Sequence, residues 1–317
     1  FLSQSPYAWP NPATPDGLPY VVKDGQRNPE ADRIPDAEAL AQSWVSTRDL
    51  ALAWFYTGDD RYSARAELVV RTWFLDPATR MNPNLRYAQL QPGSDALNTG
   101  GPIQTTDLAW LLDGVAILDS GAPGWTGADE RGMRAWLTQF LTWLTTSDQG
   151  KAESRAGNNH GSWYDTEVAA LALYLDQPDL AKTVLEAAKT TRIATQIAAD
   201  GSQPRELRRT KSWSYSVYNG RALCRLAEIG HHLGIDLWSY TTPGGGSLTK
   251  AVDFLLPAAT HGKGAWPNEQ ITPFDQGAAR DLVHAAAEEG HDPIAQAALP
   301  SIPAPTGGDL WPLLPAC

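Results

Sequence analysis

The segment LALAWFYTGDDRYSARAELVVRTW, residues 50–73, shows most clearly how this chain folds. Its apolar residues recur at three- and four-residue spacing on both sides of a short polar turn, which predicts two amphipathic helices joined as a hairpin. The segment LALYLDQPDLAKTVLEAAKTTR, residues 171–192, repeats this order, and a looser copy is residues 222–238 followed by residues 247–257. Because one hairpin cannot bury its apolar face alone, repeated hairpins stack into a solenoid or close into a toroid.

The rest of the chain extends this helical pattern. Helical periodicity also covers residues 37–57, 60–74, 105–119 and 128–146, with short turns between them, and strand signals are sparse. The first 36 residues contain too much proline and glycine for a helix or a central strand, which predicts an extended arm packed on the helices. We therefore expect an all-α fold.

Composition narrows the class of function. The chain has 317 residues, 42% of them hydrophobic, and a formal net charge of −11, so it can bury a large core. This negative net charge argues against binding nucleic acid or an anionic membrane, because those partners attract proteins with a positively charged surface. No run approaches about 18 consecutive apolar residues, so we expect no transmembrane helix. Cys224 and Cys317 have no C-x-x-C spacing, and Cys224 lies in an apolar helical pattern typical of a buried thiol.

An unusual polar segment is AGNNHGSWYD, residues 156–165, in which Asn158 and Asn159 precede His160. We interpret it as a loop between helices, because such interruptions often carry function. A metal site at His160 would need further ligands at suitable spacing, and neither H-x-x-x-H nor H-E-x-x-H occurs. The G-x-S-x-G motif of serine hydrolases is absent as well. We expect no metal and no cofactor, which leaves a structural histidine or a catalytic one.

A second polar segment, RELRRTKSWSYSVYN at residues 205–219, combines arginines with tyrosines. On a helix that begins near Thr210, Arg208 and Arg209 would lie at its entrance and Tyr215 about one and a half turns inside. An arginine can bind a carboxylate through two parallel hydrogen bonds. Together with the amides and the histidine, this set suits β-elimination from a uronic acid, because amide and guanidinium neutralise the carboxylate while imidazole and phenol move the protons.

The two segments together resemble the alginate lyase-like polysaccharide lyases, in which an Asn-Asn-His motif and a downstream Arg…Tyr motif line the cleft of an α/α toroid. The phrases SPYAWPNP, DGLPY, ALAWFYTGDDRY and TWFLDPATRMNPNLRYAQ are similar to the branch acting on alginate or β-1,4-glucuronan, so the resemblance covers most of the chain. It implies one α/α-toroid domain over residues 1–317, an incomplete barrel of about six to seven helical hairpins with residues 1–36 as an extended arm.

The resemblance also implies roles for individual residues in a β-elimination. Asn159 would neutralise the substrate carboxylate, His160 would act as base or neutraliser, and Tyr215 would act as the acid alone or as both acid and base. Two arginines are candidates for the guanidinium that neutralises the substrate carboxylate together with Asn159. Arg208 stands seven residues before Tyr215, which is the spacing of the family pattern R-A-L-x-Y-H-N-Y, whereas Arg209 is the arginine of the RT pair and is our choice.

The choice of tyrosine is open as well, because Tyr218 competes with Tyr215. We expect further substrate contacts from polar and aromatic side chains around these segments. The candidates are Asn158, Trp163, Tyr164, Arg208, Tyr218, Asn84, Tyr87, Gln89 and Trp266. Each of them also fits a structural role, as an aromatic at a helix junction or an amide in a turn. Arg80 and Arg86 could hold the carboxylates of neighbouring uronates or form surface ion pairs.

The implied partner is an acidic polysaccharide, alginate or glucuronan, bound by a monomer that contacts neither nucleic acid nor membrane. Because such polymers lie outside the cell, we expect a secreted or periplasmic enzyme. Two other functions stay open. A glycoside hydrolase on a helical toroid would recruit Asp165, Asp200 and Glu206 as paired carboxylates, and a non-catalytic helical-repeat protein would bind glycans through an aromatic groove.

Overall fold

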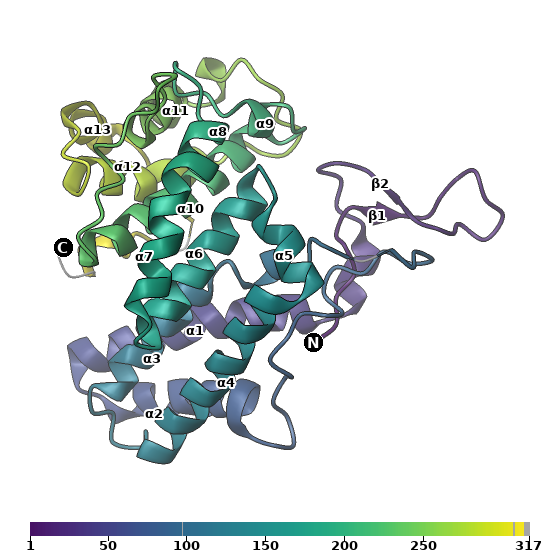
Figure 1. Cartoon of the computed structure of the whole chain (residues 1–317), viewed down its shortest axis with the longest axis vertical. Helices are drawn as coiled ribbons and strands as arrows, with labels where there is room; N and C mark the ends of the chain where they lie inside the picture. Colours follow the sequence, from purple (N-terminus) through teal and green to yellow (C-terminus); the bar gives the residue numbers. More distant parts are fainter. Residues whose placement is uncertain (97, 307, 314–317) are drawn as a thin grey trace. The chain divides into compact units, whose positions relative to one another are not determined.

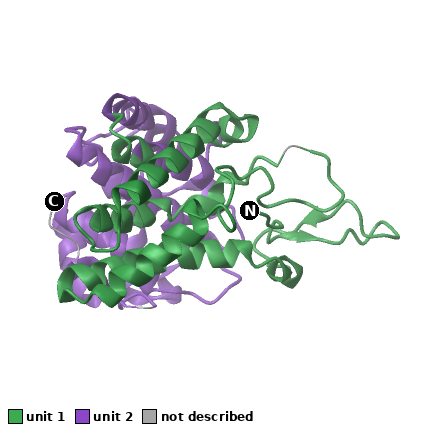
Figure 2. Ribbon diagram, turned by 90° about the horizontal axis from the view of Figure 1, so that it is seen from below, with its two compact units in different colours: residues 1–154, 170–177 green, residues 155–169, 178–317 purple. Residues whose placement is uncertain are grey.

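The computed structural model describes residues 1–96, 98–306 and 308–313. Contacts divide the chain into two compact units (Figure 2). Unit 1 comprises residues 1–154 and 170–177, and unit 2 comprises residues 155–169 and 178–317. The single domain expected over residues 1–317 stays a prediction. No helix in the described part of the chain is long and apolar enough to cross a membrane.

Unit 1 is helical apart from a short hairpin in its N-terminal arm (Figure 1). Its elements are β1 (Ala8–Trp9), β2 (Val21–Val22), η1 (Pro29–Arg33), α1 (Asp36–Thr57), α2 (Asp60–Val70), the π-helical turn η2 (Arg71–Leu75), η3 (Pro102–Thr105), α3 (Leu108–Asp119), α4 (Gly127–Thr146), α5 (Asp148–Ser154) and the C-terminal part of α6 (Asn159–Tyr174). The four helices predicted between residues 37 and 146 are confirmed as α1, α2 continued by η2, α3 and α4.

The N-terminal arm is extended, as predicted, and it ends where α1 begins. β1 and β2 pair antiparallel with Ala8 opposite Val22. Backbone hydrogen bonds hold the arm to the segment before η3, since the Ser3 amide donates to the Tyr87 carbonyl at 3.1 Å and the Leu90 amide donates to the Ser3 carbonyl at 2.8 Å. These bonds satisfy backbone groups that a proline-rich segment cannot pair within itself.

The hairpin of α1 and α2 follows from local sequence. Gly58 ends α1 with φ of 66°, a left-handed conformation that favours glycine. The Asp59 side chain then caps α2 by accepting a hydrogen bond from the backbone N–H two residues later. The aromatic core of unit 1 lies on the buried faces, where the Phe74 ring is 5.7 Å from Trp44 and 4.8 Å from Trp136, measured between centroids. Apolar periodicity thus predicts both the helices and the faces they bury.

Unit 2 is helical as well. Its elements are the N-terminal part of α6, α7 (Pro178–Ala188), the π-helical turn η4 (Lys189–Ile193), α8 (Ala194–Gln196), α9 (Pro204–Leu207), α10 (Ser212–His232), α11 (Leu248–His261), η5 (Lys263–Ala265), η6 (Gly277–Ala279), α12 (Arg280–Glu288), α13 (Pro293–Ala298), η7 (Leu299–Ser301) and η8 (Trp311–Leu313). Cys224 is a buried free thiol on α10, as predicted. Cys317 lies outside the described residues.

Candidate active site

The amide–amide–histidine segment begins helix α6 in unit 2. The carbonyl of Asn158, just before the helix, accepts hydrogen bonds from the amides of Gly161 and Ser162 at 3.0 and 3.4 Å. The predicted loop is confirmed only for residues 156–158 and is wrong from Asn159 on, because Asn159 and His160 form the first turn of α6. Asparagine and other short polar residues are common where helices start, since the first N–H groups lack partners within the helix. The missing apolar stripe therefore marked a helix start and not a loop.

Asn159 is anchored by a buried carboxylate. Glu206 on α9 accepts two hydrogen bonds from Asn159, from the backbone N–H to Oε1 and from the side-chain Nδ2 to Oε2, both at 2.8 Å. Both residues are 1% exposed. Burial raises the pKa of Glu206, while the hydrogen bonds from Asn159, the positive charge of Arg209 and a smaller contribution from nearby His160 lower it. Three of the four predicted catalytic residues thus lie within electrostatic reach of one carboxylate.

The fourth predicted catalytic residue, Tyr215, is connected through Arg209. Helix α10 begins at Ser212, two residues later than predicted, and Tyr215 lies in its first turn. The guanidinium carbon of Arg209 lies 3.7 Å from the centroid of the Tyr215 ring, and the Lys211 ammonium lies 5.8 Å from the same centroid. A cation over an aromatic face stabilises the position of both groups. Of the two arginines in competition, Arg209 is the one that contacts Tyr215, whereas Arg208 is exposed.

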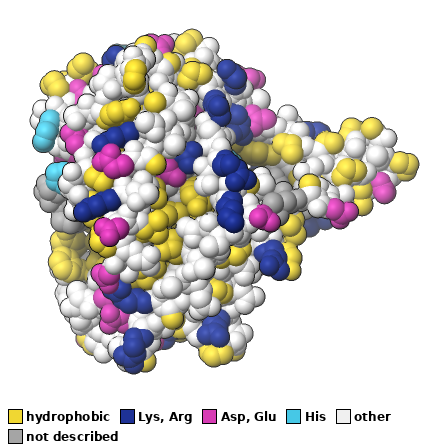
Figure 3. All heavy atoms as spheres, in the orientation of Figure 1, with side chains coloured by type: hydrophobic (Ala, Val, Ile, Leu, Met, Phe, Trp, Pro, Cys, Tyr) yellow, Lys and Arg dark blue, Asp and Glu magenta, His cyan; other side chains and the backbone are white. Residues whose placement is uncertain are grey.

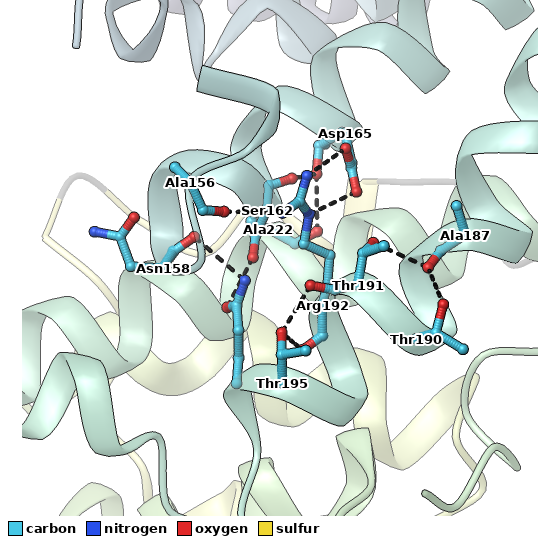
Figure 4. Close-up of polar contacts among 12 residues, drawn as sticks. Ala156, Asn158, Ser162, Asp165, Ala187, Thr190, Thr191, Arg192, Thr195 and Ala222 are labelled. Carbon is cyan, nitrogen blue, oxygen red and sulfur yellow. Dashed lines mark hydrogen bonds and ion pairs between the residues drawn. The ribbon is translucent and has the colours of Figure 1, made fainter. Parts of the chain in front are cut away.

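A buried ion pair braces the start of α6 (Figure 4). Arg192, in the π-helical turn η4, donates from Nε and Nη2 to the Asp165 carboxylate at 2.7 and 3.0 Å, and its Nη1 donates to the Ala156 carbonyl at 2.9 Å. The side chains of Arg192 and Asp165 are only 6% and 9% exposed. Gly161 lies so close to this brace that an added Cβ would be 2.5 Å from Arg192 Nη1. One guanidinium therefore fixes the chain on both sides of His160.

A chain of buried amides extends from the start of α6 to α10. Gln196 on α8 accepts hydrogen bonds on Oε1 from Ser162 Oγ at 3.0 Å and from Asn219 Nδ2 at 2.8 Å. Asn219 also donates to Gln203 Oε1 at 2.7 Å, and Gln203 Nε2 donates to the Ser216 carbonyl at 3.0 Å. Because buried polar groups need hydrogen-bond partners, this chain holds together the two helices that carry the predicted base and acid.

This supporting layer was not predicted from the sequence. Glu206 and Asp165 were expected only as candidate carboxylates of a hydrolase, and Arg192 was not among the predicted residues. A signal for Arg192 was present, because this residue continues the three- and four-residue spacing of the buried Leu185 and Ala188 on the preceding helix. A charged residue at an apolar position of an amphipathic helix indicates a buried partner.

The carboxylates of the rival hydrolase are committed to other contacts. Asp165 pairs with Arg192, and Glu206 holds Asn159. The pKa of Asp200 is lowered by hydrogen bonds from Ser202, which is the opposite of the shift that a general acid needs. Among the described residues, no three His, Cys, Asp or Glu side chains cluster as metal ligands.

Three aromatic residues predicted to bind substrate are buried in unit 2. Trp163 and Trp266 are 5% and 4% exposed, and burial is the main cause that raises the pKa of Tyr164 to about 12. The Trp266 indole donates from Nε1 to Ser212 Oγ at 2.9 Å and so supports the start of α10. The Trp163 ring packs 5.1 Å from the partly exposed Tyr218 ring. These contacts give Trp163, Tyr164 and Trp266 packing roles in the structure, and binding of substrate by these residues stays a prediction.

The other predicted substrate-binding residues are in unit 1. Tyr87 is 55% exposed, the Asn84 side chain accepts a hydrogen bond from the following Arg86 amide at 3.2 Å, and Gln89 has a positive φ of 52°. Arg80 lines a cavity of about 450 Å³ in the same unit. Binding of substrate by these residues stays a prediction.

Positive charge gathers near the candidate site although the chain is acidic overall. Arg205 and Arg208 are exposed, on α9 and directly after it. In Figure 3, dark blue Lys and Arg side chains lie over the part of the molecule that Figure 1 labels α9. Against a formal net charge of −11, this local concentration attracts an anionic ligand to this part of unit 2.

Comparisons with known proteins identify the family and the fold of the chain. A family model described as Alginate lyase matches residues 1–266. An alginate lyase structure from Bacteroides ovatus is 34% identical, with a TM-score of 0.91 over 95% of this chain and 80% of that one. Alginate lyase A1-III from Sphingomonas species A1 is 19% identical, with a TM-score of 0.64 over 91% of this chain and 79% of that one. No curated protein sequence matches the chain.

A third structure, a histidine-to-alanine variant of alginate lyase A1-III complexed with a tetrasaccharide, is 18% identical, with a TM-score of 0.66 over 93% of this chain and 76% of that one. The all-α, α/α-toroid fold class is confirmed by these similarities.

Proposed function

The chain belongs to the alginate lyase family and is a polysaccharide lyase, and from this premise we propose that it cleaves a 1,4-linked polyuronate, alginate or glucuronan, by β-elimination. The observation that supports the proposal is the set of contacts in unit 2 that links Asn159 through Glu206 to Arg209 and Tyr215, with His160 beside them. Amide, guanidinium, imidazole and phenol are the four groups that this reaction uses.

Neutralisation of the substrate carboxylate is the first requirement. The C5 proton of a uronate is weakly acidic because its removal adds negative charge next to an existing carboxylate. In the proposed mechanism the Asn159 amide and the Arg209 guanidinium bind that carboxylate. Both contacts strengthen as charge moves onto the carboxylate oxygens, so they stabilise the transition state more than the bound substrate.

Proton transfer completes the reaction. His160 takes the C5 proton, the C4–O4 bond breaks as the C4–C5 double bond forms, and the Tyr215 hydroxyl protonates the departing O4. The positive charge of Arg209 over the Tyr215 ring stabilises the phenolate that this transfer leaves. In mannuronate and glucuronate the C5 hydrogen and O4 lie on the same side of the ring, and in guluronate they lie on opposite sides. Two separate residues for base and acid suit either geometry.

The test uses ultraviolet absorbance, because elimination creates a conjugated double bond and hydrolysis does not. Mannuronate-rich alginate, guluronate-rich alginate, glucuronan and hyaluronan are each incubated with the enzyme. We expect absorbance to rise with at least one polyuronate, and Tyr215→Phe and His160→Ala each to lower turnover by at least about 10²-fold. Tyr218→Phe is the matched control, with an expected loss below about tenfold because Tyr218 packs on Trp163.

New reducing ends without absorbance would show hydrolysis and overturn the proposal. Unchanged turnover in Tyr215→Phe together with a large loss in Tyr218→Phe would move the role of the acid to Tyr218.

A further inference from the structure

We propose that Glu206 is a positioning residue for catalysis, whose carboxylate sets the orientation of the Asn159 amide toward the substrate; this inference rests on the proposed lyase activity. Glu206 accepts two hydrogen bonds of 2.8 Å from Asn159, one from its backbone N–H and one from its side-chain Nδ2. The two residues stand 47 positions apart in the chain, on α9 and α6.

The bonding pattern determines which way the amide faces. An ionised carboxylate has acceptors only, so the group that Asn159 presents to Glu206 must be its NH₂ and not its carbonyl oxygen. One Nδ2 hydrogen is used by Glu206, and the second stays available to donate to a substrate carboxylate. Rotation about χ2 of asparagine has broad, roughly two-fold minima. Without a partner such as Glu206, the amide could turn its oxygen toward the substrate and repel the carboxylate.

The same carboxylate also fixes the backbone beneath the amide. Asn159 is the first residue of α6, so its N–H has no partner inside the helix. Glu206 supplies that partner, and its negative charge is favourable at a helix N-terminus. Side chain and backbone of Asn159 are therefore held by one rigid group, which leaves the amide little freedom to move.

Glu206 links this amide to the guanidinium that acts with it. The Arg209 backbone N–H donates to the Glu206 carbonyl at 3.1 Å, so a single turn of chain carries both the anchor of Asn159 and Arg209. The backbone that carries Arg209 is thus tied to the residue that anchors the Asn159 amide. A displacement of about 1 Å in such a group can cost on the order of 10² in rate.

The first measurement is steady-state kinetics on Glu206→Gln, which keeps the size of the side chain. One end of the new amide is a donor, so at most one of the two hydrogen bonds from Asn159 survives. We expect kcat to fall by about 10- to 100-fold while KM changes less than about threefold. Glu289→Gln is the matched control, because Glu289 is a partly buried carboxylate of unit 2 that accepts a hydrogen bond from Trp238, and it should keep wild-type kcat.

A double-mutant cycle separates positioning from a direct role. If Glu206 acts through Asn159, then adding Glu206→Gln to Asn159→Ala should change kcat by less than about threefold. A full additional loss of 10-fold or more would overturn the proposal, as would wild-type kcat in the single Glu206→Gln variant. Glu206→Asp keeps the charge but shortens the side chain by one methylene, so we expect it to restore less than half of the lost activity.

A second readout does not depend on activity. In nitrogen-15 NMR spectra, the Asn159 side-chain NH₂ signals are identified by their loss in Asn159→Ala. We expect one of the two protons to be protected from exchange in the wild type and in Glu289→Gln, and to lose protection in Glu206→Gln. Retained protection in Glu206→Gln would refute the anchoring. If the wild type released no unsaturated ends from any polyuronate, the lyase proposal would fail. Protection of the Asn159 amide by Glu206 would then show a structural contact without a role in catalysis.

Discussion

Removal of the Arg192 guanidinium should destabilise the protein strongly. Arg192→Met keeps most of the aliphatic stem and deletes the donors that bind Asp165 and the Ala156 carbonyl. Breaking one side of a buried ion pair costs about 3–5 kcal/mol, because the remaining charge has no compensation. The lost bond to the Ala156 carbonyl adds about 1 kcal/mol. We therefore expect the free energy of unfolding at pH 7 to fall by about 4 kcal/mol or more.

The loss should depend on pH with a defined sign. Burial raises the pKa of Asp165, and Arg192 is the group that opposes this rise. In Arg192→Met the folded-state pKa of Asp165 rises further above its unfolded value, so the folded state binds more protons than the unfolded state between the two values. Stability of the variant should then fall as pH increases through this window, and the deficit relative to wild type should be smaller at pH 4 than at pH 7.

Urea unfolding followed by circular dichroism at both pH values provides the assay. Arg27→Met is the matched control, since Arg27 and its partner Asp32 are 62% and 48% exposed, and such a surface pair contributes at most about 1 kcal/mol. The double variant Arg192→Met/Asp165→Leu removes both charges and should recover most of the lost stability. A loss below about 1 kcal/mol in Arg192→Met at pH 7, equal to the control, would show that the buried ion pair does not stabilise the fold.

Three further predictions follow from local contacts. Gly161→Ala should lower the free energy of unfolding by about 2 kcal/mol in chemical denaturation, because the new Cβ would lie 2.0 Å from the carbonyl oxygen five residues earlier. Gly220→Ala on α10 is the control, since the atom nearest to its new Cβ would lie 3.8 Å away. This control should be neutral or stabilising by up to about 1 kcal/mol. Burial and nearby carboxylates raise the pKa of Glu289 from 4.5 to about 7. Between pH 4.5 and pH 7, Glu289 is deprotonated in the unfolded state but still protonated in the folded state, so the free energy of unfolding should decrease by about 1–2 kcal/mol over this range. Thermal unfolding of Glu289→Gln should lack this decrease. Burial also raises the pKa of the Cys224 thiol well above its usual value, so in a Cys317→Ser background Cys224 should react with a thiol reagent only after unfolding.

Helix positions could be predicted from the sequence because helix formation is local. Apolar spacing within each segment marks the buried face, and the glycine at 58 with the aspartate at 59 marks the turn between α1 and α2. The start of α6 was missed for a local reason too. Its first turn is polar, and without an apolar stripe the segment around Asn159 and His160 resembles a loop.

The chemical identities of the candidate catalytic groups were also within reach of the sequence. Asn159, His160, Arg209 and Tyr215 form a set that suits only a few reactions, whatever the fold around them. The choice between Arg208 and Arg209 was not within reach, because neighbouring residues point in different directions and spacing alone favours Arg208. In the structure the Arg209 guanidinium contacts the Tyr215 ring at 3.7 Å, which supports Arg209, and the catalytic role of either arginine stays a prediction.

The all-α class, the hairpin pattern and the inventory of polar groups could be predicted from the amino-acid order, because periodicity and side-chain chemistry are properties of short segments. The partners of these polar groups became known only from the packing of the helices. Glu206 meets Asn159 across 47 positions and Arg192 meets Asp165 across 27, and the indole of Trp266 lies inside unit 2. Such pairings depend on how whole helices pack. The sequence shows Glu206 only as a possible reactive carboxylate, whereas in the packed structure it is buried and holds Asn159 in place.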